Sequence, residues 1–110
     1  MKNPIASKKL ELAVDILHTG AGGIKERLWY AFLFFNGLTL EDFPQNLKKQ
    51  YEFIISTLTT EDATSNLIGQ PIERIQNTLE KMDIQNCIYI AEKIVNLNTD
   101  LKLYTILHQN

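Results

Sequence analysis

Apolar residues recur every three or four positions along most of this chain, and short stretches rich in proline, glycine or polar residues interrupt the pattern. This spacing places apolar side chains on one face of an α-helix, so it predicts helices between the interruptions. The fold class predicted is all-α, a compact bundle of four to five helices joined by short loops. A chain of 110 residues fits one domain, so we expect residues 1–110 to form a single α-helical domain.

The first two predicted helices flank a glycine-rich turn. Asn3-Pro4 is typical of a helix start, because the amide can cap the first turn and proline fits the first helical position. We expect this helix to continue to about His18 and Gly20 to close it in the left-handed conformation. The second helix is predicted from about residue 23 to residue 36, with apolar residues nearly all round its circumference.

Three further helices are predicted from proline and cap residues. Thr39 can start one helical turn before Pro44 begins the third helix, Pro71 begins the fourth, and Asp83 caps the fifth. The polar segment 59–70 is the most loop-like part of the chain. The apolar face predicted for the fifth helix consists of Ile84, Cys87, Ile88, Ala91, Ile94 and Val95.

The third and fourth helices each have an apolar stripe, and Phe53 lies off the stripe of its helix. For residues 98–110 the pattern leaves two alternatives, a last short helix or a packed tail. The stripe of the third helix consists of Leu47, Tyr51, Ile54, Ile55 and Leu58. The stripe of the fourth helix consists of Ile72, Ile75, Leu79 and Met82.

The charge and the apolar runs argue against nucleic-acid and membrane partners. The formal net charge is -2, so the chain lacks the basic excess that attracts phosphate backbones. The longest apolar run, Leu28–Phe35, is far shorter than the roughly 20 residues of a membrane-spanning helix. The start of the chain lacks the pattern of a signal peptide. We therefore expect a cytoplasmic protein without a membrane partner, and nucleic-acid binding remains only a weak alternative.

Few residues stand in arrangements that support catalysis or metal binding. Glu11, Asp15 and His18 share one helix face, but a metal site in a bundle needs facing ligands from a second helix. We expect a solvated stripe there and no metal site. Cys87 lies on an apolar helix face and is expected to be an inert, buried thiol. The sequence predicts no catalytic residue, no cofactor and no enzymatic activity.

The glycine-rich turn at residues 20–27 is a candidate anion-binding site. Backbone N–H groups and the positive end of the helix dipole are exposed where such a turn enters a helix, so a phosphate could bind there. The turn lacks the known phosphate-loop patterns, and Glu26 would repel an anion. The stronger interpretation is a helix end followed by an inter-helix turn. The candidate residues are Gly22, Gly23, Lys25 and Arg27.

The second helix has more aromatic residues than one helix face can bury. Trp29, Tyr30 and Phe34 exceed what a small bundle can bury beside the other apolar residues of that helix, and Phe53 adds to the surplus. Trp and Tyr are typical of binding hot spots, and an exposed apolar patch is typical of an interface. The alternative is that the second helix is the central helix of the bundle, covered on all sides.

These observations favour a small protein-interaction module as the leading hypothesis. It would self-associate or bind a protein partner through Trp29, Tyr30, Phe34 and Phe53 on the second and third helices, as a regulator, inhibitor, antitoxin, immunity protein or adaptor. One alternative is a regulator that binds a phosphorylated small ligand at Gly20–Arg27. A second alternative is a weak nucleic-acid-binding protein.

Overall fold

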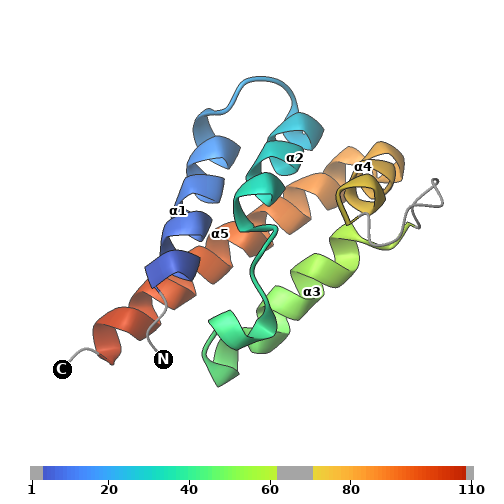
Figure 1. Ribbon diagram of the computed structural model, residues 1–110. Coiled ribbons are helices and arrows are strands. Elements are labelled where there is room, and N and C mark those ends of the chain that lie inside the picture. Colours follow the sequence, from blue (N-terminus) through green and yellow to red (C-terminus); the bar gives the residue numbers. More distant parts are fainter. Residues whose placement is uncertain (1–3, 62–70, 109–110) are drawn as a thin grey trace.

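The computed structural model describes residues 4–61 and 71–108 of the chain (Figure 1). These residues form five α-helices and two short 3₁₀ helices, without a β-strand, which confirms the predicted all-α fold. The elements in chain order are α1 (Pro4–Thr19), α2 (Ile24–Phe35), η1 (Leu40–Asp42), η2 (Gln45–Leu47), α3 (Lys48–Leu58), α4 (Pro71–Lys81) and α5 (Ile84–Leu107).

The longest helix, α5, organises the bundle. It contacts α1, α2 and α3, and α1 and α2 lie side by side as a hairpin against it (Figure 1). The start of α1 and the end of α5 lie at the same end of the molecule (Figure 1). Lys102 Nζ near the end of α5 is 3.3 Å from Oε2 of Glu11 in the middle of α1. Within the described part of the chain, no helix is both long enough and apolar enough to cross a membrane.

The buried face of α5 differs from the face that the sequence predicted. Ile84 and Ile88 were expected in the core, but they are 54% and 48% exposed. Ile88 lies about 120° round the helix from Ile94, which is fully buried. Apolar residues cover more than one face of α5, so packing against the other helices decides which stripe is buried. The buried apolar stripe is Cys87, Ile90, Ile94, Leu97 and Leu101.

Both ends of the fifth helix are resolved by the structure. Asp83 caps α5 as predicted, since its Oδ1 accepts a hydrogen bond of 2.7 Å from the backbone N–H of Asn86. Residues 98–107 form neither a separate short helix nor a tail, because α5 continues through them to Leu107.

The turn between α1 and α2 corrects the role predicted for Gly20. Among the described glycines only Gly22 has a positive φ, of 90°, so Gly20 is not in the left-handed conformation. The Gly20 N–H instead donates to the Ile16 carbonyl at 2.8 Å. A Cβ atom at Gly20 would lie only 2.5 Å from that carbonyl oxygen. Gly20 is therefore needed for close backbone approach, and the sharp change of direction occurs at Gly22.

Tyr51 fixes the connection between α2 and α3. Its hydroxyl donates to the Leu38 carbonyl at 2.8 Å, and its ring stacks on Phe43 with centroids 4.4 Å apart. Thr39 precedes the predicted helical turn, and its backbone N–H donates to Asp42 Oδ2 at 2.7 Å. Burial is the main reason that the pKa of Tyr51 is raised to about 12, and the charge of Asp42 adds to the shift.

The raised pKa of Tyr51 predicts a loss of stability in alkaline solution. The unfolded chain releases this proton near pH 10, whereas the folded chain holds it to about pH 12, so the folded state loses stability as the pH rises through that interval. We expect wild type to lose up to about 2 kcal/mol more than Tyr51→Phe between these values. Urea unfolding of both proteins at several pH values measures the difference, and equal losses would contradict the assignment.

Side chains of α4 bind the segment that follows α3. The buried Thr78 hydroxyl accepts from the Glu61 backbone N–H at 3.0 Å and donates to the Arg74 carbonyl at 2.8 Å. Arg74 Nη2 donates to the Thr59 carbonyl at 2.7 Å. Most of the predicted loop 59–70 lies outside the described residues, as does the Ile72 side chain, but Ile75 and Leu79 are buried as predicted.

Replacing the Thr78 hydroxyl should destabilise the fold measurably. Thr78→Val keeps the shape of the side chain but leaves the Glu61 N–H without its partner, so we expect a loss of about 1–3 kcal/mol in the free energy of unfolding. Thr99→Val is the matched control, because Thr99 is exposed and bonds only the Val95 carbonyl of its own helix. Chemical denaturation should show a change below about 0.5 kcal/mol for the control.

Candidate functional site

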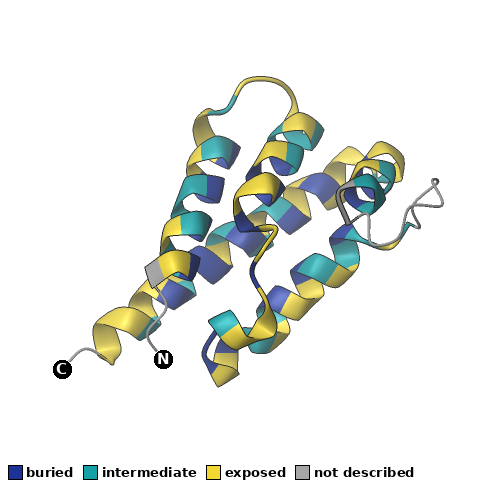
Figure 2. Ribbon diagram, in the orientation of Figure 1, coloured by how far each residue is buried: buried dark blue, intermediate teal, exposed yellow. Residues whose placement is uncertain are grey.

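The aromatic surplus of α2 is divided between the core and the surface. Leu28, Ala31, Phe32 and Phe35 are buried, whereas Tyr30, Leu33 and Phe34 are exposed. The ribbon of α2 accordingly has both buried and exposed positions (Figure 2). The exposed fractions of these three side chains are 51%, 43% and 37%. Their spacing of three and four residues places them next to one another on the helix surface. We call Tyr30, Leu33 and Phe34 the α2 ridge.

Trp29 occupies the border between this ridge and the core. Its side chain is half-buried and packs against the buried cluster. The central-helix alternative therefore accounts for Trp29 in part, but it does not account for the α2 ridge. No ring contact joins Trp29, Tyr30 or Phe34 to Phe53 in the part of the chain that the structure describes.

Phe53 contributes to a different surface, between α3 and α5. Its side chain is 44% exposed, and its ring meets the Tyr89 ring edge-on with centroids 6.3 Å apart. Lys93 Nζ lies 5.1 Å from the centroid of the Tyr89 ring, within the range of a cation–π interaction. Tyr89 and Lys93 are not among the residues of the apolar face predicted for the fifth helix, and the sequence did not predict that Tyr89 is the partner of Phe53.

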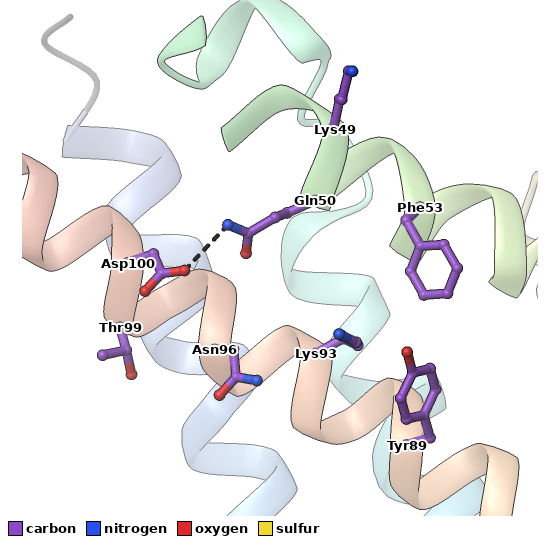
Figure 3. A pocket seen from close by; sticks show the side chains of 8 residues that line it. All are labelled: Lys49, Gln50, Phe53, Tyr89, Lys93, Asn96, Thr99 and Asp100. Carbon is purple, nitrogen blue, oxygen red and sulfur yellow. Dashed lines mark hydrogen bonds between the residues drawn. The ribbon is translucent and has the colours of Figure 1, made fainter. Parts of the chain in front are cut away.

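A groove of about 540 Å³ runs between α3 and α5 from this aromatic pair. We call it the α3–α5 groove. At its other end Gln50 Nε2 donates to Asp100 Oδ2 at 3.1 Å (Figure 3). A second hollow of about 290 Å³ continues from Gln50 and Asp100 to Leu103 and Leu107 near the end of α5. The groove and its continuation together therefore have an aromatic end, a polar middle and an aliphatic end.

The charges in the groove lack ionic partners within the described residues. Lys48, Lys81 and Lys102 each form a salt bridge with a glutamate. Neither Lys49 nor Lys93, which both line the groove, has a carboxylate within salt-bridge distance in the described ranges 4–61 and 71–108. The groove can therefore accept an acidic group beside aromatic surface.

The charged residues of the glycine-rich turn are engaged with the protein itself. Arg27 Nε donates to the Gly22 carbonyl at 3.0 Å, and Lys25 Nζ donates to the Glu80 carbonyl at 3.1 Å. The Glu26 carboxylate accepts from the Gly23 N–H at 3.4 Å, so an acidic side chain already lies at the start of α2. Binding of an anion here stays a prediction, and these contacts favour the interpretation as a helix end and inter-helix turn.

Phosphate distinguishes the two interpretations of this turn. Arg27→Ala removes the hydrogen bond to Gly22 and a weaker one of 3.5 Å to the Leu17 carbonyl. We expect it to lower the free energy of unfolding by about 1 kcal/mol, equally with and without phosphate. Thermal unfolding measures this, with Lys9→Ala as a control for loss of a positive charge. Protection of wild type by phosphate that disappears only in Arg27→Ala would instead support the anion site.

Glu11, His18 and Cys87 were also considered as candidates for metal binding or catalysis. Glu11 forms ion pairs with Lys8 at 3.7 Å and with Lys102 at 3.3 Å. His18 lines a shallow hollow of about 490 Å³ between α1, α2 and α5, together with Ile88. Cys87 is fully buried, and burial raises the pKa of its thiol, with Lys25 lowering it and Asp83 raising it to smaller extents. Its thiol is therefore disfavoured as a thiolate nucleophile.

Comparison of this chain with protein-family models, curated proteins and solved structures finds no match. Inference about its function consequently depends on the two exposed surfaces, the α2 ridge and the α3–α5 groove.

Proposed function

We propose that this protein is a small protein-interaction module and that the α2 ridge is a principal contact surface. The observation that carries the proposal is the exposure of Tyr30, Leu33 and Phe34 beside a core that is already filled by other residues of α2. Exposed apolar side chains of this size gain free energy when a partner covers them.

The composition of the ridge suits protein recognition. Tyr offers a large apolar ring with a polar hydroxyl and few rotatable bonds, and residues of this type dominate binding hot spots. Leu33 and Phe34 extend the Tyr30 surface along one helix face, so a partner would cover adjacent apolar groups rather than isolated ones. Regulators, inhibitors, antitoxins, immunity proteins and adaptors all act through such surfaces.

Neither alternative ligand class is supported by a specific contact. Lys25 Nζ and Arg27 Nε, two groups that a phosphorylated ligand could use, each already donate a hydrogen bond to a backbone carbonyl. The net charge of -2 gives no electrostatic support to nucleic-acid binding. The proposal is therefore confined to protein partners.

The proposal is tested with a ridge variant, Tyr30→Ser combined with Phe34→Ser. Affinity capture from the native cell extract, quantified by mass spectrometry, should recover at least one protein with wild type and about tenfold less of it with this variant. The matched control is Ile84→Ser combined with Ile106→Ser, which removes two apolar residues that are 54% and 64% exposed on α5.

Circular dichroism and thermal unfolding must show that both variants remain folded. If wild type, ridge variant and control capture the same proteins in the same amounts, the α2 ridge is not the contact surface and the proposal fails.

A further inference from the structure

One side of α5 has a second stripe of residues at alternating spacings of four and three, separate from its buried stripe. This spacing is the heptad pattern by which two helices pack along their length. The stripe faces the α3–α5 groove, which its first four members line (Figure 3). Its last three members line the continuation of the groove. The stripe residues are Tyr89, Lys93, Asn96, Asp100, Leu103 and Leu107.

The side chains of this stripe match those of a second stripe that runs in the opposite direction, because apolar groups then meet apolar groups and each charge meets an opposite charge. Tyr89 at one end is 47% exposed, and Leu103 near the other end is 53% exposed. Lys93 and Asp100 lie between them, on either side of Asn96. If a second copy of α5 runs antiparallel across a two-fold axis near Asn96, Tyr89 faces Leu103 of the second copy and Lys93 faces Asp100 of the second copy. A two-fold axis repeats both contacts, as in isologous dimers.

The two central charges lack ionic partners of their own. Lys93 contacts the Tyr89 ring, and Asp100 accepts a hydrogen bond from the neutral Gln50 amide. Neither forms a salt bridge within residues 4–61 and 71–108. Antiparallel pairing would give each charge an opposite charge at a partly dehydrated contact, where such pairs fix orientation and register.

The length and the walls of the groove also suit a helix. From Tyr89 to Leu107 the stripe covers 19 residues, which corresponds to a rise of about 27 Å along an α-helix. Phe53 of α3 flanks the Tyr89 end, so a docked helix would cover this exposed ring as well. Binding of an amphipathic helix in a groove between two helices is a common recognition mode.

We propose that the α3–α5 groove binds a second copy of this chain, with the two α5 helices antiparallel and Lys93 paired with Asp100 of the second copy. This inference goes beyond the proposed function, because it depends on α5 and leaves the α2 ridge uncovered. The dimer contact and the contact with another protein are then separate surfaces of one molecule.

A charge exchange tests the pairing on the whole chain. Lys93→Asp and Asp100→Lys each place like charges opposite one another in the dimer, so each variant alone should weaken self-association at least tenfold in sedimentation equilibrium. The double variant Lys93→Asp/Asp100→Lys restores opposite charges and should associate within about threefold of wild type. Lys9→Asp on α1 is the control for a change of net charge and should leave self-association unchanged.

Mixing the two single variants gives the decisive measurement. One copy then carries two acidic groups at these positions and the other carries two basic groups, so an equimolar mixture should form a heterodimer although neither variant dimerises alone. If either variant were unfolded, the mixture could not form this heterodimer. Rising salt should weaken the mixed dimer, since its contacts are ionic.

Three results would overturn the inference. They are a monomeric wild type up to millimolar concentration, a dimer that both single variants leave intact, and a mixture that stays monomeric. The ridge variant Tyr30→Ser/Phe34→Ser should retain the dimer. A monomeric wild type would reject this inference without affecting the α2 ridge, whereas an unchanged set of captured proteins in the ridge test would reject the proposed function without affecting the groove.

Discussion

The buried apolar stripe of α5 is the contact on which the rest of the structure depends. Cys87, Ile90, Ile94 and Leu97 are completely shielded from solvent, and α1, α2 and α3 all pack against this helix. The interface also contains Asn98, whose buried Oδ1 has no hydrogen-bond partner among residues 4–61 and 71–108. An unsatisfied buried oxygen costs about 1–3 kcal/mol, so the apolar burial along α5 offsets that cost. The rotation of α5 about its own axis is fixed by this stripe.

The rotation of α5 also determines which of its side chains face the surface of the bundle. With Ile90 and Ile94 turned inward, Tyr89, Lys93 and Asp100 face the groove beside α3, and Ile88 lies in the hollow beside α1 and α2. The position of α3 depends in turn on Tyr51, which binds the Leu38 carbonyl and stacks on Phe43. The α3–α5 groove is therefore a consequence of core packing at two places, rather than a feature of one segment.

Local signals were sufficient to predict the helices, but not their rotation. Pro4 and Asp83 act through their own turn, so the starts of α1 and α5 could be predicted from sequence. The face of α5 was predicted wrongly at Ile84 and Ile88, since a helix with apolar residues on several sides needs its tertiary partners to define the core. Likewise the sequence shows that Phe53 lies off its stripe, but its contact with Tyr89 joins residues far apart in the chain.

The two exposed surfaces differ in how much they specify about a partner. The α2 ridge carries no charged side chain, so it can contribute affinity but gives little control of orientation or register. The stripe of α5 has apolar residues at its ends and opposite charges inside. The proposed antiparallel second copy would match both features at once. A parallel copy aligned in the same register would bring Lys93 against Lys93 and Asp100 against Asp100. The order of charges along α5 therefore disfavours parallel pairing as much as it favours the antiparallel one.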